Sequence, residues 1–198
     1  MLNSICADYH RLKSALPDLE FISINATEAD LLCHDFVENF LGKLAKANVN
    51  PHSISLEFTE TLLMVNDTMH IQQVLGRLRS QGISIALDDF GTGFSSLTHL
   101  RDFPIDKIKI DRSFTNGINR DQNSLMIVQA LTSMGHSMSL EIVAEGVENE
   151  RESEMLTHLG CRLGQGYFFS HAESVARIEL GAARLCQRAS EKVVSSSS

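Results

Sequence analysis

Side chains that carry only oxygen donors recur where short apolar runs end in this 198-residue chain. They are Asn25, Glu57, Asp88, Asp89 and Glu145, and no His or Cys occupies an equivalent position. Carboxylate and amide oxygens suit a hard cation such as Mg²⁺, Mn²⁺ or Ca²⁺ rather than zinc or copper. Four carboxylates in one place would repel one another unless cations lay between them. The set therefore predicts a metal centre, plausibly of two ions, that activates water for attack at phosphorus.

The pair Asp88-Asp89 is the clearest of these positions. Residues 83–87 form an apolar run typical of a strand buried on both faces, and the two acids end that run. Parallel-sheet enzymes place their active sites at the carboxyl ends of strands. The alternative interpretation is that the two acids are only a turn signal before Gly91. The residues at the ends of the other apolar runs distinguish these two interpretations.

Two further polar side chains stand at run-ends of their own. Lys109 can hold a nucleophilic water or offset charge on phosphoryl oxygens, and Gln165 can orient a ligand or a water. Residues 106–111 alternate, with Lys107 on the same face as Lys109. We expect Lys107 to lie on a solvent-exposed edge.

Glu57 and Glu60 lie three residues apart, so on a strand their side chains face opposite ways. Both need not be metal ligands. One of them can instead anchor the loop over residues 91–95 by accepting its backbone N–H groups.

Six strand-like runs, each followed by a helical pattern, carry these residues. The runs are residues 19–25, 53–60, 83–87, 106–111, 139–146 and 162–169. The helical patterns cover residues 1–17, which precede the first run, and then 27–44, 67–80, 95–101, 121–135, 149–159 and 173–188. Such alternation predicts a parallel sheet with right-handed crossovers, either doubly wound or closed as a barrel. Because polar residues end all six runs, and not only two neighbouring ones, the pattern favours the barrel.

Composition limits the partners and the location. The net charge of −8 argues against DNA or RNA as a partner, although it permits a phosphate ligand held through a cation. The four cysteines form no CxxC pair, which predicts reduced thiols and a cytoplasmic protein. No apolar run approaches 18 residues, so we expect no membrane segment. We expect one domain over residues 1–190 and a disordered tail at 191–198.

Residues 88–97, DDFGTGFSSL, resemble the signature loop of EAL domains, the bacterial cyclic di-GMP phosphodiesterases. Phe94 stands where the family usually has Tyr, and Thr27 stands where it has Ser. The remaining motifs follow in order as INAT at 24–27, LEFTE at 56–60, KIKID at 107–111, VAEGVE at 143–148 and QGY at 165–167. The resemblance covers about residues 18–172.

This resemblance implies a modified (β/α)₈ barrel, similar to a TIM barrel, that hydrolyses cyclic di-GMP to linear pGpG with Mg²⁺ or Mn²⁺. It assigns the metals to Asn25, Glu57, Asp88, Asp89 and Glu145. It assigns catalytic roles to Lys109, Glu145 and Gln165, with Lys109 and Gln165 serving the nucleophilic water. Glu60 would anchor the loop that begins at Asp89, and Glu148 would support the site. The same loop and its neighbouring helices imply a homodimer.

The chain departs from the family at its beginning. EAL domains start with two further strands, and the second carries the Glu-Ala-Leu motif, whose Glu is a metal ligand. Only 24 residues precede Asn25 here, and none of them reads E-x-L-x-R. We therefore expect a barrel without its first two strands, with open edges that favour self-association.

Three functional hypotheses follow. The first is a cyclic di-GMP phosphodiesterase. The alternative is a non-catalytic EAL module that binds cyclic di-GMP or a protein partner in signalling. The third is a fragment of a longer protein, without a function of its own.

Overall fold

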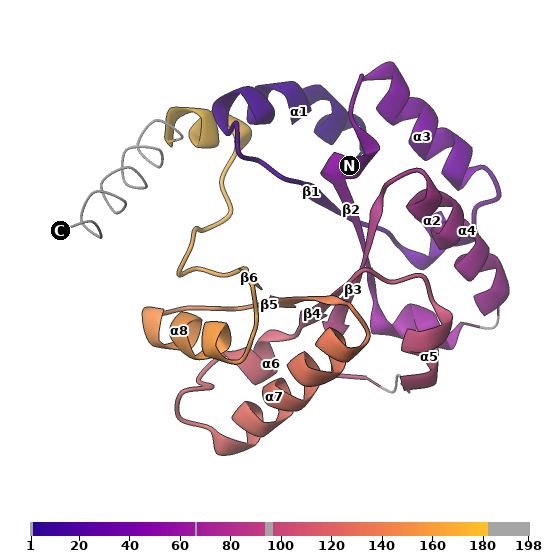
Figure 1. Cartoon of the computed structure of the whole chain (residues 1–198). Coiled ribbons are helices and arrows are strands. Elements are labelled where there is room, and N and C mark those ends of the chain that lie inside the picture. Colours follow the sequence, from indigo (N-terminus) through magenta and orange to yellow (C-terminus); the bar gives the residue numbers. More distant parts are fainter. Residues whose placement is uncertain (1, 66, 94–96, 182–198) are drawn as a thin grey trace.

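The computed structural model describes residues 2–65, 67–93 and 97–181 of the chain. Six parallel strands form one sheet in the order of the sequence (Figure 1). They are β1 (Ile22–Asn25), β2 (Ile54–Thr59), β3 (Ser84–Phe90), β4 (Lys107–Ile110), β5 (Glu141–Ala144) and β6 (Leu163–Gly164). The prediction of parallel strands that alternate with helices is confirmed. The expected tail at 191–198 lies outside the described residues, as do residues 94–96 of the signature loop.

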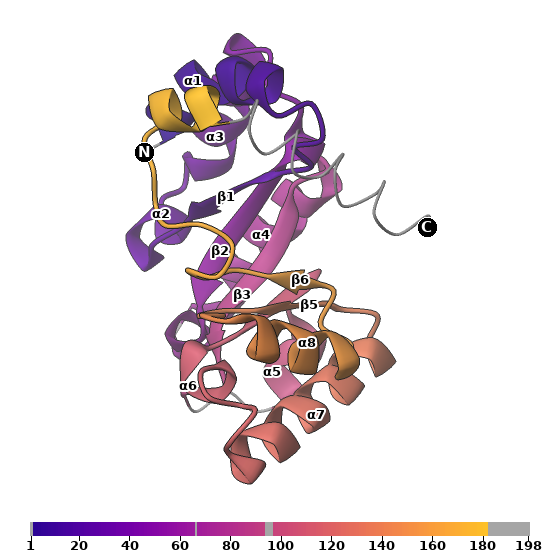
Figure 2. The same cartoon turned by 90° about the vertical axis from the view of Figure 1, so that its left-hand side faces the viewer.

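Helices cover the outer face of the curled sheet (Figures 1 and 2). They are α1 (Leu2–Ala15), α2 (Glu28–Leu32), α3 (Phe36–Lys46), α4 (Thr68–Ser80), α5 (Leu97–Asp102), α6 (Arg112–Thr115), α7 (Gln122–Ser137) and α8 (Glu150–His158). Two short 3-10 turns are η1 (Pro51–Ser53) and η2 (Glu60–Met64), and a helical segment covers 175–181. The side chains of Asp67, Asp121 and Asn149 cap the helices that the sequence predicts after them.

One helix that the sequence predicts is divided into two helices in the structure. The pattern over 27–44 predicts a single helix, but α2 ends at Leu32 and α3 begins at Phe36. Cys33 takes an extended conformation between them, with φ −73° and ψ 122°. The break redirects the chain, so that Leu31 from α2 and Phe40 from α3 are both buried in the same core. An uninterrupted helix would not have presented both faces to that core.

The last strand is shorter than the pattern over 162–169 predicts. β6 ends at Gly164, and residues 167–169 form a turn. Gly166 has φ +156°, and a Cβ added to it would lie 2.2 Å from the carbonyl oxygen of Val147. The chain passes so close to Val147 that it turns away from the sheet after Gln165.

The curl of the sheet also overturns the expectation for Lys107. Its side chain is buried instead of lying on an exposed edge. The ammonium lies 3.4 Å from the centroid of the Phe21 ring and 3.2 Å from the carboxylate of Glu141. The curvature turns the inner face of β4 towards the interior, where a cation needs an anion and an aromatic face beside it.

The sheet is open on one side. Within the described residues no strand pairs with the outer edge of β1 or of β6, and a cavity of about 360 Å³ lies along the inner face of the sheet. The segment 175–181 lies beside α1 (Figure 1), where Arg11 contacts Glu179 at 2.7 Å. Among these same residues, no helix combines the length and the apolar character needed to span a bilayer.

The packing of α4 provides a matched test of the fold. Leu75 is fully buried, whereas a Cβ added to the neighbouring Gly76 would contact nothing within 4 Å. We expect Leu75→Ala to lower the free energy of unfolding by about 2–5 kcal/mol through lost packing. We expect Gly76→Ala to raise it by about 0.5–1 kcal/mol, because alanine favours a helix over glycine.

Urea denaturation followed by circular dichroism measures both changes. A destabilising Gly76→Ala together with a neutral Leu75→Ala would contradict the orientation of α4.

Candidate active site

Strand register places the site residues on one face of the sheet. In parallel strands, paired residues face the same side, and Glu57 pairs with Asn25 on β1 and with Ala86 on β3. Ala86 in turn pairs with Lys107 on β4. Asp88 and Lys109 lie two residues beyond these partners and therefore share the inner face at its carboxyl end.

Lys109 is the centre of the site. Its ammonium lies 2.7 Å from Glu57, 2.9 Å from Asp88 and 2.6 Å from Glu145, and its side chain is 5% exposed. Burial alone would lower the pKa of Lys109, but hydrogen bonds to the three carboxylates outweigh that effect and raise the pKa overall. The group therefore stays protonated at neutral pH, and it can act as a cation and hydrogen-bond donor but not as a base.

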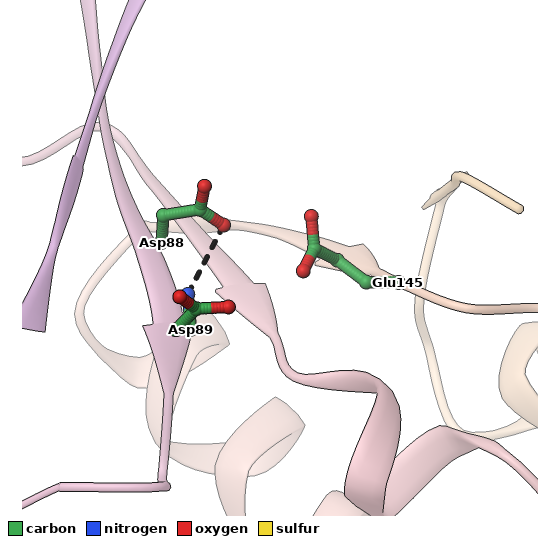
Figure 3. Close-up of side chains that lie close together, drawn as sticks. All are labelled: Asp88, Asp89 and Glu145. Carbon is green, nitrogen blue, oxygen red and sulfur yellow. Dashed lines mark hydrogen bonds between the residues drawn. The ribbon is translucent and has the colours of Figure 1, made fainter. Parts of the chain in front are cut away.

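Asp89 extends this cluster towards solvent. Its backbone has φ +55°, a left-handed conformation, and its N–H donates to the carboxylate of Asp88 at 3.0 Å. One oxygen each from Asp88, Asp89 and Glu145 lie within 4.8 Å of one another (Figure 3). This all-oxygen group fits a hard cation such as Mg²⁺ or Mn²⁺.

Two carboxyl groups of the cluster have raised pKa values, and burial is the main cause for both. Burial, and then the nearby charge of Asp88, raise the pKa of Asp89. Burial also raises the pKa of Glu145, although Lys109 partly opposes it. A single ammonium offsets four carboxylates, so a divalent cation would find a favourable potential here.

The other predicted site residues differ in their position relative to these three carboxylates. Glu57 contacts Lys109 but is not one of the three clustered carboxylates. Asn25 ends β1, where it is exposed and pairs in register with Glu57. Gln165 lines both the 360 Å³ cavity, beside Lys109, and a second cavity of about 270 Å³, beside Glu145.

The two supporting glutamates occupy different places. Glu60 is buried at the start of η2 and accepts a hydrogen bond from the N–H of Gly93 at 2.9 Å. A Cβ added to Gly93 would lie 2.9 Å from that carboxylate, so a larger residue there would displace the end of the Glu60 side chain. Glu148 is exposed and lines the 270 Å³ cavity with Asp89.

Sequence reasoning missed two residues of this second cavity. Asp111 and Arg112 both line it, and the charge of Asp111 contributes to the raised pKa of Asp89. The alternating pattern placed Asp111 on the same face as Lys109, which was the available signal. No local pattern pointed to Arg112.

Several known proteins are similar to this chain in sequence. The chain is 36% identical over 179 residues to the cyclic di-GMP phosphodiesterase NbdA of Pseudomonas aeruginosa, covering 90% of this chain and 23% of that protein. It is 37% identical over 150 residues to the cyclic di-GMP phosphodiesterase PA2567 of the same organism, covering 75% of this chain and 25% of that protein. The chain thus spans about a quarter of the length of these relatives.

Solved structures agree in fold. The EAL domain of Mycobacterium smegmatis DcpA superposes with a TM-score of 0.85 at 32% identity, covering 92% of this chain and 82% of that one. A manganese and cyclic di-GMP complex of Klebsiella pneumoniae BlrP1 superposes with a TM-score of 0.73 at 31% identity, covering 84% of this chain and 43% of that one. The EAL domain profile matches residues 1–172, and the chain belongs to the EAL domain family.

Proposed function

We propose that this chain hydrolyses cyclic di-GMP to linear pGpG with Mg²⁺ or Mn²⁺. One observation carries the proposal: carboxylates from three strands surround a buried ammonium at the carboxyl edge of a parallel sheet. Two relatives that are named cyclic di-GMP phosphodiesterases support it, as does a structural neighbour in complex with manganese and cyclic di-GMP.

The proposed metal ligands are those that the resemblance assigns, with the clustered carboxylates of Asp88, Asp89 and Glu145 at the centre. Glu57 and Asn25 would complete the set from β2 and β1. When bound, the ions would make water more acidic and stabilise charge on the phosphoryl oxygens.

The remaining site residues would orient the water and the ligand and would offset negative charge. Lys109 is a protonated group that gives no base catalysis, and its three N–H groups face three carboxylates. Once bound ions engage those carboxylates, it would donate to the nucleophilic water or to a phosphoryl oxygen. Gln165 borders both cavities, from where its amide can orient that water or the ligand. Glu60 would hold the loop after Asp89, and Glu148 would support the site from the second cavity.

A second candidate is a non-catalytic module that binds cyclic di-GMP or a protein partner. The observation that favours it is Lys109 itself, which already gives three carboxylates a charged partner within the protein. Calorimetry separates the two candidates, since binding without turnover indicates a receptor. Absence of binding would indicate a protein-interaction role.

We also propose a cytoplasmic location and self-association. Self-association is supported by the outer edges of β1 and β6, with which no strand pairs in the described part of the chain. Sedimentation velocity should then show a sedimentation coefficient that rises with protein concentration. A single monomeric species up to about 100 μM would contradict self-association, because specific dimers commonly bind more tightly than that.

Removal of one clustered carboxylate tests the proposed reaction. We expect Asp88→Asn to lower Mn²⁺-dependent formation of pGpG by more than about 100-fold, since even outer partners of a metal contribute about 10–100-fold. Chromatography of the nucleotides measures the product. The control is Asp18→Asn, the same substitution at an exposed residue before β1, which should leave turnover unchanged. Equal activity of Asp88→Asn and the wild type would refute the assigned site.

Removal of the central cation tests its role as counter-ion. We expect Lys109→Met to lower the free energy of unfolding in EDTA by about 3–5 kcal/mol, because three carboxylates lose their buried partner. Added Mn²⁺ should then stabilise the variant more than the wild type. Exposed Lys46 is the control, since Lys46→Met should change stability by no more than about 0.5 kcal/mol. Equal stabilisation of Lys109→Met and the wild type by Mn²⁺ would argue against this role.

A further inference from the structure

The short helix α6 separates the two loops that carry the clustered carboxylates. It follows β4 directly, while the loop after β3 begins near Asp89 and the loop after β5 begins at Glu145. On the β3 side it contacts Gly91, which has φ +98°. A Cβ added to Gly91 would lie 3.0 Å from the ring of Phe114, so the loop rests against this ring with no space to spare.

The contact on the β5 side is closer. Gly146, immediately after Glu145, has φ +65°, and a Cβ added there would lie 2.4 Å from the Cβ and 3.2 Å from the Cα of Arg112. The backbone of α6 therefore lies directly against the backbone of the Glu145 loop. A helix in contact with both loops sets the distance between them.

Hydrogen bonds fix Glu145 itself to this segment. The hydroxyl of Thr115, a fully buried residue of α6, donates to the carbonyl oxygen of Glu145. The N–H of Glu145 donates to the carbonyl oxygen of Ile110, at the end of β4, at 3.1 Å. Both backbone polar groups of Glu145 are thus bonded to the chain between Ile110 and Thr115.

A buried carboxylate joins the same two segments again. Glu152 is 3% exposed, and its two oxygens accept the N–H groups of Gly117 at 2.8 Å and of Glu148 at 2.9 Å. Burial alone would raise the pKa of Glu152, but these N–H groups lower it overall, so the carboxylate is ionised. The chain that leaves α6 and the loop that follows Glu145 therefore share one anion.

We propose that α6 is the positioning element of the site and that the Thr115 hydroxyl is a positioning group, which holds the Glu145 carboxylate at its distance from Asp88 and Asp89. The proposal rests on the proposed metal centre, because the function of that distance is to bring oxygens around one cation. Thr115 touches neither substrate nor metal in this scheme, and it acts only through the backbone of Glu145.

Isosteric removal of the hydroxyl tests this role. In the full chain, we expect Thr115→Val to weaken Mn²⁺ binding by about 10-fold, the lower end of what outer partners of a metal contribute. Thr115→Ser keeps the hydroxyl, so its dissociation constant for Mn²⁺ should stay within about threefold of the wild-type value. That change is much smaller than the effect of removing an outer partner of a metal. The electron paramagnetic resonance signal of free Mn²⁺ measures the dissociation constants without any need for turnover.

Thr132→Val is the matched control. Thr132 is also buried, and its hydroxyl donates to the carbonyl oxygen of Val128 within α7, away from the acidic cluster. Its loss should change the urea midpoint but not the affinity for Mn²⁺. If Thr115→Val does not fold, Thr115→Ser against Thr115→Ala repeats the comparison, because these variants differ only in the hydroxyl.

The outcomes separate the two proposals. If the wild type binds Mn²⁺ and Thr115→Val binds it with equal affinity, the positioning role is overturned and the metal centre stands. If Thr132→Val loses as much affinity for Mn²⁺ as Thr115→Val, the positioning role is overturned as well, because the lower affinity would then come from lower stability alone. A wild type that binds no Mn²⁺ would refute the metal centre, and the positioning role with it.

Discussion

The buried ammonium of Lys109 among three carboxylates is the interaction on which the site depends. Charges removed from water are tolerated only when partners of opposite sign lie at hydrogen-bond distance, and Lys109 has three such partners within 2.9 Å. The partners come from β2, β3 and the end of β5, and the lysine comes from β4. The carboxyl ends of four strands must therefore meet, which requires the sheet to curl.

The elements outside the sheet maintain that curl and the loops that extend from it. Helices cover the outer face of the sheet (Figure 2). The inner face carries the polar groups at one end and the cavity of about 360 Å³ along its length. The loop after β3 turns through the left-handed conformation of Asp89 and is held further on by Glu60 through Gly93. The loop after β5 rests on α6. Each carboxylate of the clustered group thus has its own support from a neighbouring element.

The charge balance of the site connects the structure to the chemistry of the family. The single ammonium of Lys109 lies among four carboxylates, those of Glu57, Asp88, Asp89 and Glu145, so the formal charge of this group is negative. Divalent cations compensate such a charge, and a phosphodiester ligand can then bind next to acidic residues. Under the proposed function, the same compensation by cations would let an acidic chain, with a net charge of −8, accept an anionic dinucleotide.

Local pattern in the sequence was sufficient for the alternation of strands and helices and for the polar residues at the strand ends. Periodicity and capping residues such as Asp67 act over a few neighbours, so they can be read along the chain. The six strands, their parallel direction and the positions of Glu57 and Lys109 near strand ends follow from such signals. Membership of the EAL domain family was also predictable, because its motifs occur in order.

Contacts between segments that are distant in the sequence could be identified only from the tertiary structure. Lys107 is buried because the sheet curls, and α6 is held in place by loops that lie about 20 residues before it and 30 after it in the chain. Glu152 looks like an ordinary acid in the first turn of α8, yet it joins two loops near the site. The pattern could not separate Glu57, which contacts Lys109, from the three clustered carboxylates either, since all of them lie at strand ends. Those distinctions depend on curvature and long-range packing, which no local repeat of residues encodes.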